Sequence, residues 1–139
     1  MKVLTYLINL DGSQERLDSA TQQLNQHGFE FARIPAYDGR GKALSDFTQY
    51  DDKQAQQTMG RSLLGAELGC YLSHVRCVER FLHTDADYLM VFEDDLQLVD
   101  DSKKIIDEIL VYLQERQDFD WYLINIAARK KKLSKPLMS

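Results

Sequence analysis

The chain has 139 residues, of which 44% are hydrophobic and 28% charged, so it is long and apolar enough to fold as one domain. Seven glycines and two prolines are too few for a fibrous protein, and no apolar run approaches the roughly 20 residues of a membrane-spanning helix. Five of the 17 basic residues follow the last acidic one, so residues 1–128 carry a net charge of −10. Such an acidic body argues against a nucleic-acid-binding surface, which needs Lys and Arg.

The N-terminal segment 1–8 is basic and then apolar, as the start of a signal peptide is. However, the apolar run stops at Asn9 and Asp11 without a small-residue cleavage site. We therefore expect a buried strand over 3–9, and a cytoplasmic rather than a secreted protein.

The next elements are marked by caps and by apolar periodicity. A helix is predicted over 13–27, capped by Ser13 and stopped by the glycine that follows it. Alternating apolar residues predict a second strand over 29–34. The segment 36–64 is polar and irregular, which indicates a functional loop or a weak helix around 51–59.

From Gly65 onward the sequence has a clear helical periodicity. Its large apolar residues form one wide arc, which we expect to face the core, with Ser73, Arg76 and Arg80 on the opposite side. The residues of this arc are Leu68, Leu72, Val75, Val78, Phe81 and Leu82.

Three further elements complete the predicted fold. The continuous apolar run 88–92 predicts a central strand that is buried on both faces. Apolar spacing predicts a helix over 105–113, and another apolar run predicts a strand over 121–126. This order predicts an α/β protein with a mostly parallel sheet and helices on both of its faces.

The two cysteines lie seven residues apart in the predicted helix, about 10 Å along its axis, which is too far for a disulfide. We expect free thiols in a reducing compartment. Cys70, His74 and Cys77 share one face of this helix, which invites a zinc interpretation. Because a fourth ligand is missing and the neighbours are core residues, the sequence does not favour zinc.

The strongest chemical signal is the acidic triplet Glu93–Asp95, which follows the apolar run 88–92 directly. Between Asp85 and Asp101 there are seven acidic residues and no Lys or Arg. Ligands of open α/β sheets bind at the carboxyl ends of the strands, and hard oxygen ligands suit Mg²⁺ or Mn²⁺. The triplet is therefore a candidate metal site, with a solvated acidic loop as the alternative.

A second candidate group lies at the end of the first predicted strand and comprises Asn9, Asp11 and Arg16. If the strands are parallel, this group shares a sheet edge with Glu93–Asp95. Its amide and carboxyl groups can bind a sugar ring or ribose, and Arg16 can bind a phosphate. A plain helix cap explains the same spacing.

A third group comprises Glu67, Tyr71 and His74, which cluster on one side of the helix that starts at Gly65. A buried glutamate needs a polar partner, so this side either carries internal hydrogen bonds or faces a polar cleft.

Three known motifs each lack residues that their chemistry requires. The segment 60–65 resembles a phosphate-binding loop, but Ala66 and Glu67 replace the Lys and Ser/Thr that it requires. The segment 9–13 resembles the haloacid dehalogenase motif, with Asn9 in place of the nucleophilic aspartate. The segment 85–95 lacks the central glycine of an EF-hand.

Four segments together resemble glycosyltransferase family 25, of the lipooligosaccharide galactosyltransferase type. In chain order they are 8–11 with Arg16, 31–36 with Asp38 and Gly39, 65–74, and 92–95. The resemblance covers nearly the whole chain. It implies a GT-A-like (Rossmann-like) fold, a UDP-sugar donor (most often UDP-galactose), a Mn²⁺ or Mg²⁺ ion, and inverting transfer to a hydroxyl of a glycan or lipooligosaccharide (LPS) acceptor.

The resemblance also implies roles for individual residues. Asp95 would be the direct metal ligand, and Glu93 would face the ribose or the waters of the metal. The other substrate-binding residues that it implies are Asn9, Asp11, Arg16, Asp38, Glu67, Ser73, His74 and Asp94.

Members of this family continue beyond the strand predicted at 121–126, and that further part supplies acceptor contacts, another metal ligand and the catalytic base. The resemblance thus implies a nucleotide-sugar-binding domain over 1–128, truncated at its C-terminus and with no catalytic residue assigned. The alternative is an inactive nucleotide-sugar-binding or partner module. The basic tail 129–139 is interpreted as a solvated terminus, with peripheral contact with anionic inner-membrane lipid as the alternative.

Overall fold

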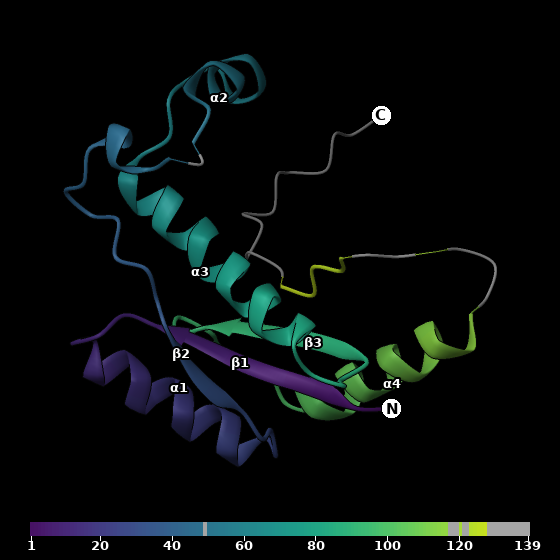
Figure 1. The fold of residues 1–139 in the computed structure, drawn as a ribbon. Helices are drawn as coiled ribbons and strands as arrows, with labels where there is room; N and C mark the ends of the chain where they lie inside the picture. The colour runs from purple at the N-terminus through teal and green to yellow at the C-terminus, as the bar shows by residue number, and fades with distance from the viewer. Residues whose placement is uncertain (49, 117–119, 121–122, 128–139) are drawn as a thin grey trace, which may run out of the picture. The chain divides into compact units, whose positions relative to one another are not determined.

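The computed structural model describes residues 1–48, 50–116, 120 and 123–127. The chain divides after Lys104 into two compact units, each of which is described by itself. The first unit holds most of the regular structure, and the last helix begins just before the division (Figure 1). The elements are β1 (Val3–Asn9), α1 (Gln14–Gln26), β2 (Ala32–Pro35), the 3₁₀ turn η1 (Leu44–Asp46), α2 (Asp52–Met59), α3 (Gly65–Leu82), β3 (Tyr88–Glu93) and α4 (Ser102–Glu115).

The described strands form one parallel sheet in the order β2-β1-β3, which confirms the predicted α/β fold. The prediction of 88–92 as the central strand is wrong within the described residues, because β1 is central and β3 lies at an edge. An apolar run shows that helices cover both faces of a strand, but it does not show how many strands flank it. Of the strand predicted at 121–126, residues 123–126 have no regular structure, and 121–122 lie outside the described residues.

The two faces of the sheet are covered by different helices of the first unit: α1 lies on one face and α3 on the other (Figure 1). The α3 face carries a core cluster of Tyr6, Ile8, Ile34 and Cys77. Because side chains alternate along a strand, Leu7 faces the α1 side, where it is fully buried, as is Leu24 of α1. Burial of each of these leucine side chains stabilises the folded state by about 1.5 to 3 kcal/mol.

Helix α3 packs on the sheet mainly through small residues, so the predicted apolar arc faces the core only in part: Leu68 is buried, whereas Val78 and Leu82 are exposed. Its buried residues are Leu68, Gly69, Ser73 and Cys77, whereas Leu82 of the arc is 72% exposed. A Cβ at Gly69 would lie 2.6 Å from the carbonyl oxygen of Tyr37, so only a residue without a side chain fits this approach. Hydropathy gives glycine and serine little weight, and for that reason the pattern placed Ser73 on the side opposite the core although it is buried.

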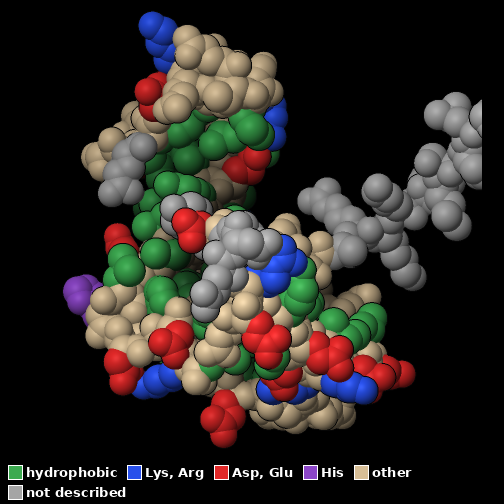
Figure 2. Space-filling model, turned by 90° about the vertical axis from the view of Figure 1, so that its right-hand side faces the viewer, with side chains coloured by type: hydrophobic (Ala, Val, Ile, Leu, Met, Phe, Trp, Pro, Cys, Tyr) green, Lys and Arg blue, Asp and Glu red, His purple; other side chains and the backbone are tan. Residues whose placement is uncertain are grey.

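Large hydrophobic side chains therefore remain at the surface of the described part of the chain, Tyr71 and Val78 of α3 among them. Figure 2 shows hydrophobic side chains reaching the surface of one face, among acidic and basic ones. No helix in the described ranges combines the length and the apolar character needed to cross a bilayer.

The other predicted helices are confirmed with small changes at their ends. Ser13 occupies the N-cap position of α1, but its side chain makes no capping hydrogen bond. The second strand is shorter than predicted and begins at Ala32. Phe29, which precedes it, packs edge-on against the ring of Phe92, with 5.3 Å between ring centroids. Helix α2 is capped by Asp51 and ends at Gly60, whose φ of 74° is a left-handed conformation that glycine adopts freely.

Candidate functional site

The candidate site lies at the switch point of the sheet, where the connections after neighbouring strands run in opposite directions. From β1 the chain passes through α1 to β2, and it then returns through α3 to β3 on the opposite side of β1. The carboxyl ends of β1 and β3 are neighbours, with Ile8 paired to Glu93. Ligands of open α/β sheets bind in the crevice at such a switch point, and here the acidic triplet and the end of β1 meet.

Asp94 connects the triplet to β1 and α1. One of its carboxylate oxygens accepts a hydrogen bond from Asn9 Nδ2 at 2.8 Å, and the other lies 2.8 Å from Arg16 Nη2. The predicted proximity of Asn9 and Arg16 to the triplet is therefore confirmed. The side chain of Asp94 is only 11% exposed, and both of its oxygens are engaged, so Asp94 holds the loop in place in this structure.

Arg33 of β2 completes this network, although no role was predicted for it. Its guanidinium donates to the side-chain and backbone oxygens of Asn9, each at 3.0 Å, and to Asp11 Oδ1 at 2.6 Å. Asn9 is 2% exposed, and its amide also donates to the backbone oxygen of Ser13. The sequence signal for this contact is an arginine on the strand beside β1, within reach of Asp11, the acid that follows β1.

Asp95 lies at the rim of an open depression on the α1 side. Within the described part of the chain, no hydrogen bond or ion pair holds its exposed carboxylate. The depression has a volume of about 310 Å³. It is lined by Glu15, Arg16, Ser19 and Gln23 of α1 and by residues 94–97.

Gln23 fixes the loop that forms the other side of this depression. Its amide nitrogen donates to the backbone oxygen of Leu96 at 3.1 Å, and its amide oxygen accepts from the backbone nitrogen of Leu98 at 3.0 Å. No role was predicted for Gln23, because a glutamine on a helix surface carries no distinct pattern. Its contacts hold the segment after the triplet against α1.

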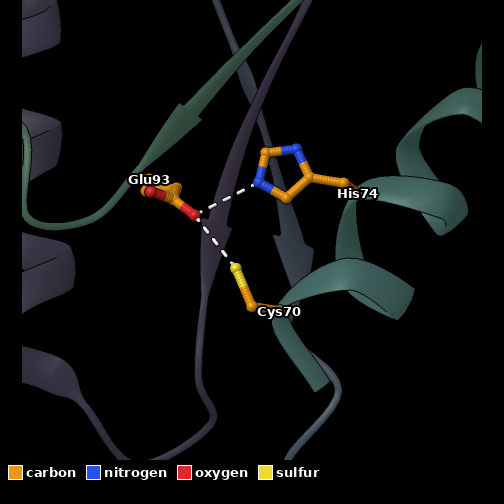
Figure 3. A group of neighbouring side chains, drawn as sticks. All are labelled: Cys70, His74 and Glu93. Atoms are coloured by element: carbon orange, nitrogen blue, oxygen red, sulfur yellow. Dashed lines mark hydrogen bonds and ion pairs between the residues drawn. The ribbon is translucent and has the colours of Figure 1, made fainter. Parts of the chain in front are cut away.

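Glu93 points to the α3 side, where Cys70 and His74 point toward it (Figure 3). Its Oε1 atom lies 3.3 Å from Cys70 Sγ and 3.1 Å from His74 Nε2. Burial alone would raise the pKa of Glu93, but hydrogen bonds from His74 and Cys70 and the charges of His74 and Arg16 lower it below its ordinary value. Burial and the Glu93 carboxylate raise the pKa of the Cys70 thiol to about 11, so this thiol is protonated at neutral pH.

Three other predicted site residues have local partners. Asp38 binds Arg40, and these hydrogen bonds lower the pKa of Asp38 to about 2. The buried Ser73 accepts a hydrogen bond from the backbone nitrogen of Tyr37 at 2.8 Å. Glu67 pairs with Arg61 and accepts from the backbone nitrogen of Leu64.

These contacts show how the predicted residues are distributed. Among the residues that the structure describes, no hydrogen bond or ion pair joins Asp38, Glu67 or Ser73 to the triplet. The partner that Glu67 was expected to need is Arg61. Their predicted substrate-binding roles stay predictions.

The donor atoms at the switch point fit a hard divalent cation. Carboxylate oxygens are the ligands that Mg²⁺ and Mn²⁺ prefer, and their sites often combine one or two carboxylates with substrate phosphates. The exposed carboxylate of Asp95 meets this requirement, whereas Glu93, the second predicted metal ligand, faces Cys70 and His74 on the α3 side. Arg16, whose side chain is half-exposed, brings a positive charge to the same depression.

Fold and site together define an α/β protein with its polar site at the carboxyl ends of parallel strands. Residues 3–138 match the family model described as glycosyltransferase family 25 (LPS biosynthesis protein). The chain therefore belongs to glycosyltransferase family 25, as the four sequence segments predicted.

Several curated proteins are similar to the chain. Human procollagen galactosyltransferase 2 is 24% identical over 135 residues, which cover 94% of this chain and 21% of the human protein. A glycosyltransferase 25 family member of Anopheles gambiae is 32% identical over 98 residues, covering 66% of this chain and 16% of that protein. Procollagen galactosyltransferase 1 of Danio rerio is 26% identical over 94% of this chain and 22% of its own length. The chain thus spans about a fifth of the length of these relatives.

Proposed function

We propose that this chain binds a nucleotide-sugar donor at the switch point between β1 and β3 and takes part in transferring the sugar to a glycan. The observation that carries this proposal is the exposed carboxylate of Asp95 beside the depression, in a chain of glycosyltransferase family 25. UDP-galactose is the proposed donor, because two of the similar proteins are named galactosyltransferases. The proposed acceptor is a lipooligosaccharide (LPS) or another glycan, in line with the description of the family.

Each residue of the site has its own proposed role in binding the donor. Asp95 would hold a Mn²⁺ or Mg²⁺ ion, which when bound would neutralise charge on the departing diphosphate. Arg16 would bind a phosphate oxygen, while Asp94 and Asn9 keep Arg16 and the loop in position. The sugar would transfer with inversion to an acceptor hydroxyl, and no residue described here is assigned as the base.

Calorimetry of UDP binding tests the metal site directly. UDP should bind in the presence of Mn²⁺ and lose at least about tenfold in affinity in EDTA, because the ion that Asp95 would hold would offset the charge of the diphosphate. Asp95→Asn keeps the shape but removes the charge, so it should abolish the effect of Mn²⁺. Asp100→Asn is the matched control, an exposed acid of the same loop outside the depression, and should bind as the unchanged chain does.

Equal UDP affinity with Mn²⁺ and with EDTA, or an Asp95→Asn variant that binds normally, would support the solvated-loop interpretation instead. Release of UDP from UDP-galactose with a glycan acceptor separates a transferase from an inactive donor-binding or partner module, which binds UDP without turnover. The domain bounds 1–128, the cytoplasmic location and a contact of the tail with the inner membrane stay predictions. Residues 129–139 of that tail lie outside the described residues.

A further inference from the structure

We propose that Cys70, His74 and Glu93 form a binding site for a thiophilic divalent cation such as Zn²⁺, with its fourth coordination position open to solvent. The three side chains converge from two elements, with Cys70 and His74 on α3 and Glu93 at the end of β3 (Figure 3). This site is distinct from the proposed Asp95 metal site. It requires neither the sugar donor nor glycosyl transfer.

The geometry of the three ligand atoms is close to that of a zinc site. The Cys70 sulfur, a ring nitrogen of His74 and a carboxylate oxygen of Glu93 all lie within 4.8 Å of one another. Zinc bonds of about 2.0 to 2.3 Å at tetrahedral angles separate neighbouring ligand atoms by about 3.3 to 3.6 Å. The pairs that involve Glu93 measure 3.3 and 3.1 Å, so small side-chain rotations would admit the ion.

The backbone places these ligands with little freedom. Cys70 and His74 are one helical turn apart, so their side chains project from the same side of α3. Glu93 pairs in register with Ile8, and Ile8 belongs to the core cluster that includes Cys77 of α3. Residues paired across parallel strands project to the same face, which directs Glu93 toward α3.

The ligand set indicates zinc rather than magnesium. Thiolate is a soft ligand and imidazole a borderline one, and both favour zinc over hard cations. All three residues are exposed, so an ion can enter and a fourth ligand can reach it. Three protein ligands with an open position are typical of catalytic rather than structural zinc sites.

The structure also corrects the ligand set that the sequence suggested. Cys77 is fully buried in the core cluster and is not available as a ligand, whereas Glu93 takes the third position. Zinc binding replaces the hydrogen bond between Cys70 and Glu93 with a metal–sulfur bond. The thiol proton leaves to solvent, as it does in other thiolate sites.

Titration of the full chain with Co²⁺, a spectroscopic substitute for zinc, tests the proposal. The unchanged chain should show a thiolate-to-cobalt charge-transfer band that Zn²⁺ abolishes by competition. Cys70→Ser should lose the band although Cys77 is still present, and His74→Ala should weaken Co²⁺ binding by at least about tenfold. His83→Ala, an exposed histidine at the end of the same helix, is the matched control and should bind as before.

A second measurement does not depend on any variant. Zn²⁺ should slow alkylation of the exposed Cys70 by a maleimide at least about tenfold, as read by peptide mass spectrometry. An unchanged alkylation rate, the absence of a thiolate band, or a band that persists in Cys70→Ser would each overturn the proposal. Asp95→Asn should keep the cobalt band while losing Mn²⁺-dependent UDP binding, so this inference and the proposed function fail separately.

Discussion

The three consecutive carboxylates Glu93–Asp95 have different surroundings because neighbouring residues at a strand end project in different directions. Glu93 is directed to α3, Asp94 is held by Asn9 and Arg16, and Asp95 reaches the depression beside α1. The sequence presents them as one acidic triplet. In the structure Asp94 positions the loop, whereas Glu93 faces α3 and Asp95 faces the depression.

Glu67 gives a prediction about pH at the residue scale. Hydrogen bonds from Arg61 and from the backbone nitrogen of Leu64 lower the pKa of Glu67 from its ordinary 4.5 to about 2. A carboxyl with a lowered pKa in the folded state stabilises the fold above the pKa of the unfolded chain, and this contribution is lost as the pH falls through the folded value. The contribution of Glu67 should therefore be complete above pH 4.5 and should decline toward pH 2.

Urea unfolding between pH 2 and 7 measures this contribution. Glu67→Gln should be less stable than the unchanged chain near pH 7, and the difference in the free energy of unfolding should shrink as the pH falls toward 2. Glu79→Gln, at an exposed position of the same helix, is the control and should leave the pH profile unchanged. A difference for Glu67→Gln that is the same at every pH would contradict this account.

At the scale of elements, the close approach of α3 to the loop after β2 depends on glycines. Gly65 and Gly69 of α3 face Gly39, and a Cβ on any of the three would lie less than 3 Å from a backbone atom of the other segment. This contact lets Ser73 bind the backbone of Tyr37 and orients the α3 turn that carries Cys70 and His74. The packing of small residues thus positions the α3 side of the site.

Gly69→Ala tests this contact, because the change in the free energy of unfolding is positive if helix propensity dominates and negative if the added Cβ clashes. Alanine in a helix is favoured over glycine by about 1 kcal/mol, but the added Cβ would lie 2.6 Å from the carbonyl oxygen of Tyr37 and 2.8 Å from the nitrogen of Gly39. Because both are backbone atoms that cannot rotate away, we expect the clash to dominate and the chain to lose about 1 to 3 kcal/mol.

Chemical denaturation measures the change in the free energy of unfolding. Ala66→Gly, the reverse substitution at an exposed position of the same helix, isolates the propensity difference and should destabilise by about 1 kcal/mol or less. A Gly69→Ala variant more stable than the unchanged chain would show that α3 does not need this close approach.

At the scale of the whole molecule, the sequence predicts the parts of the site that lie on periodic elements. The strand over 3–9, the apolar run 88–92 and the acids that follow each of them were sufficient to place Asn9 near Asp94, because parallel strands deliver their carboxyl ends to one edge. Strand order and the buried face of α3 were not predictable, since neither the number of flanking strands nor the packing of small residues changes the hydropathy pattern.

The contacts that the sequence did not predict depend on the register in which β2 and β3 pair with β1. Arg33 reaches Asn9 and Asp11 because β2 pairs with β1 so that Arg33 lies beside Leu7, two residues before Asn9. Glu93 meets Cys70 and His74 because it pairs with Ile8 on the α3 side. A shift of one residue in either pairing would direct these side chains to the opposite face.

Ligand binding at the switch point should stabilise the folded chain as a whole. A ligand that binds the folded state alone adds RT ln(1 + [L]/Kd) to the free energy of unfolding, which is about 1.4 kcal/mol at ten times Kd. For a chain of this size the midpoint of thermal unfolding should rise by about 3 to 5 °C with UDP and Mn²⁺ together. Either component alone should give a smaller rise, because Asp95 would hold the ion and the ion would offset the charge of the diphosphate.

Thermal unfolding with matched variants separates this effect from nonspecific stabilisation. Asp95→Asn should lose the combined shift, because a neutral amide cannot balance the charge of the ion at the rim of the depression. Cys70→Ser should keep it, since Cys70 contacts Glu93 and does not line the depression. A shift of equal size in Asp95→Asn would place the UDP–metal complex elsewhere on the chain, and the carboxyl ends of β1 and β3 would then no longer be the site.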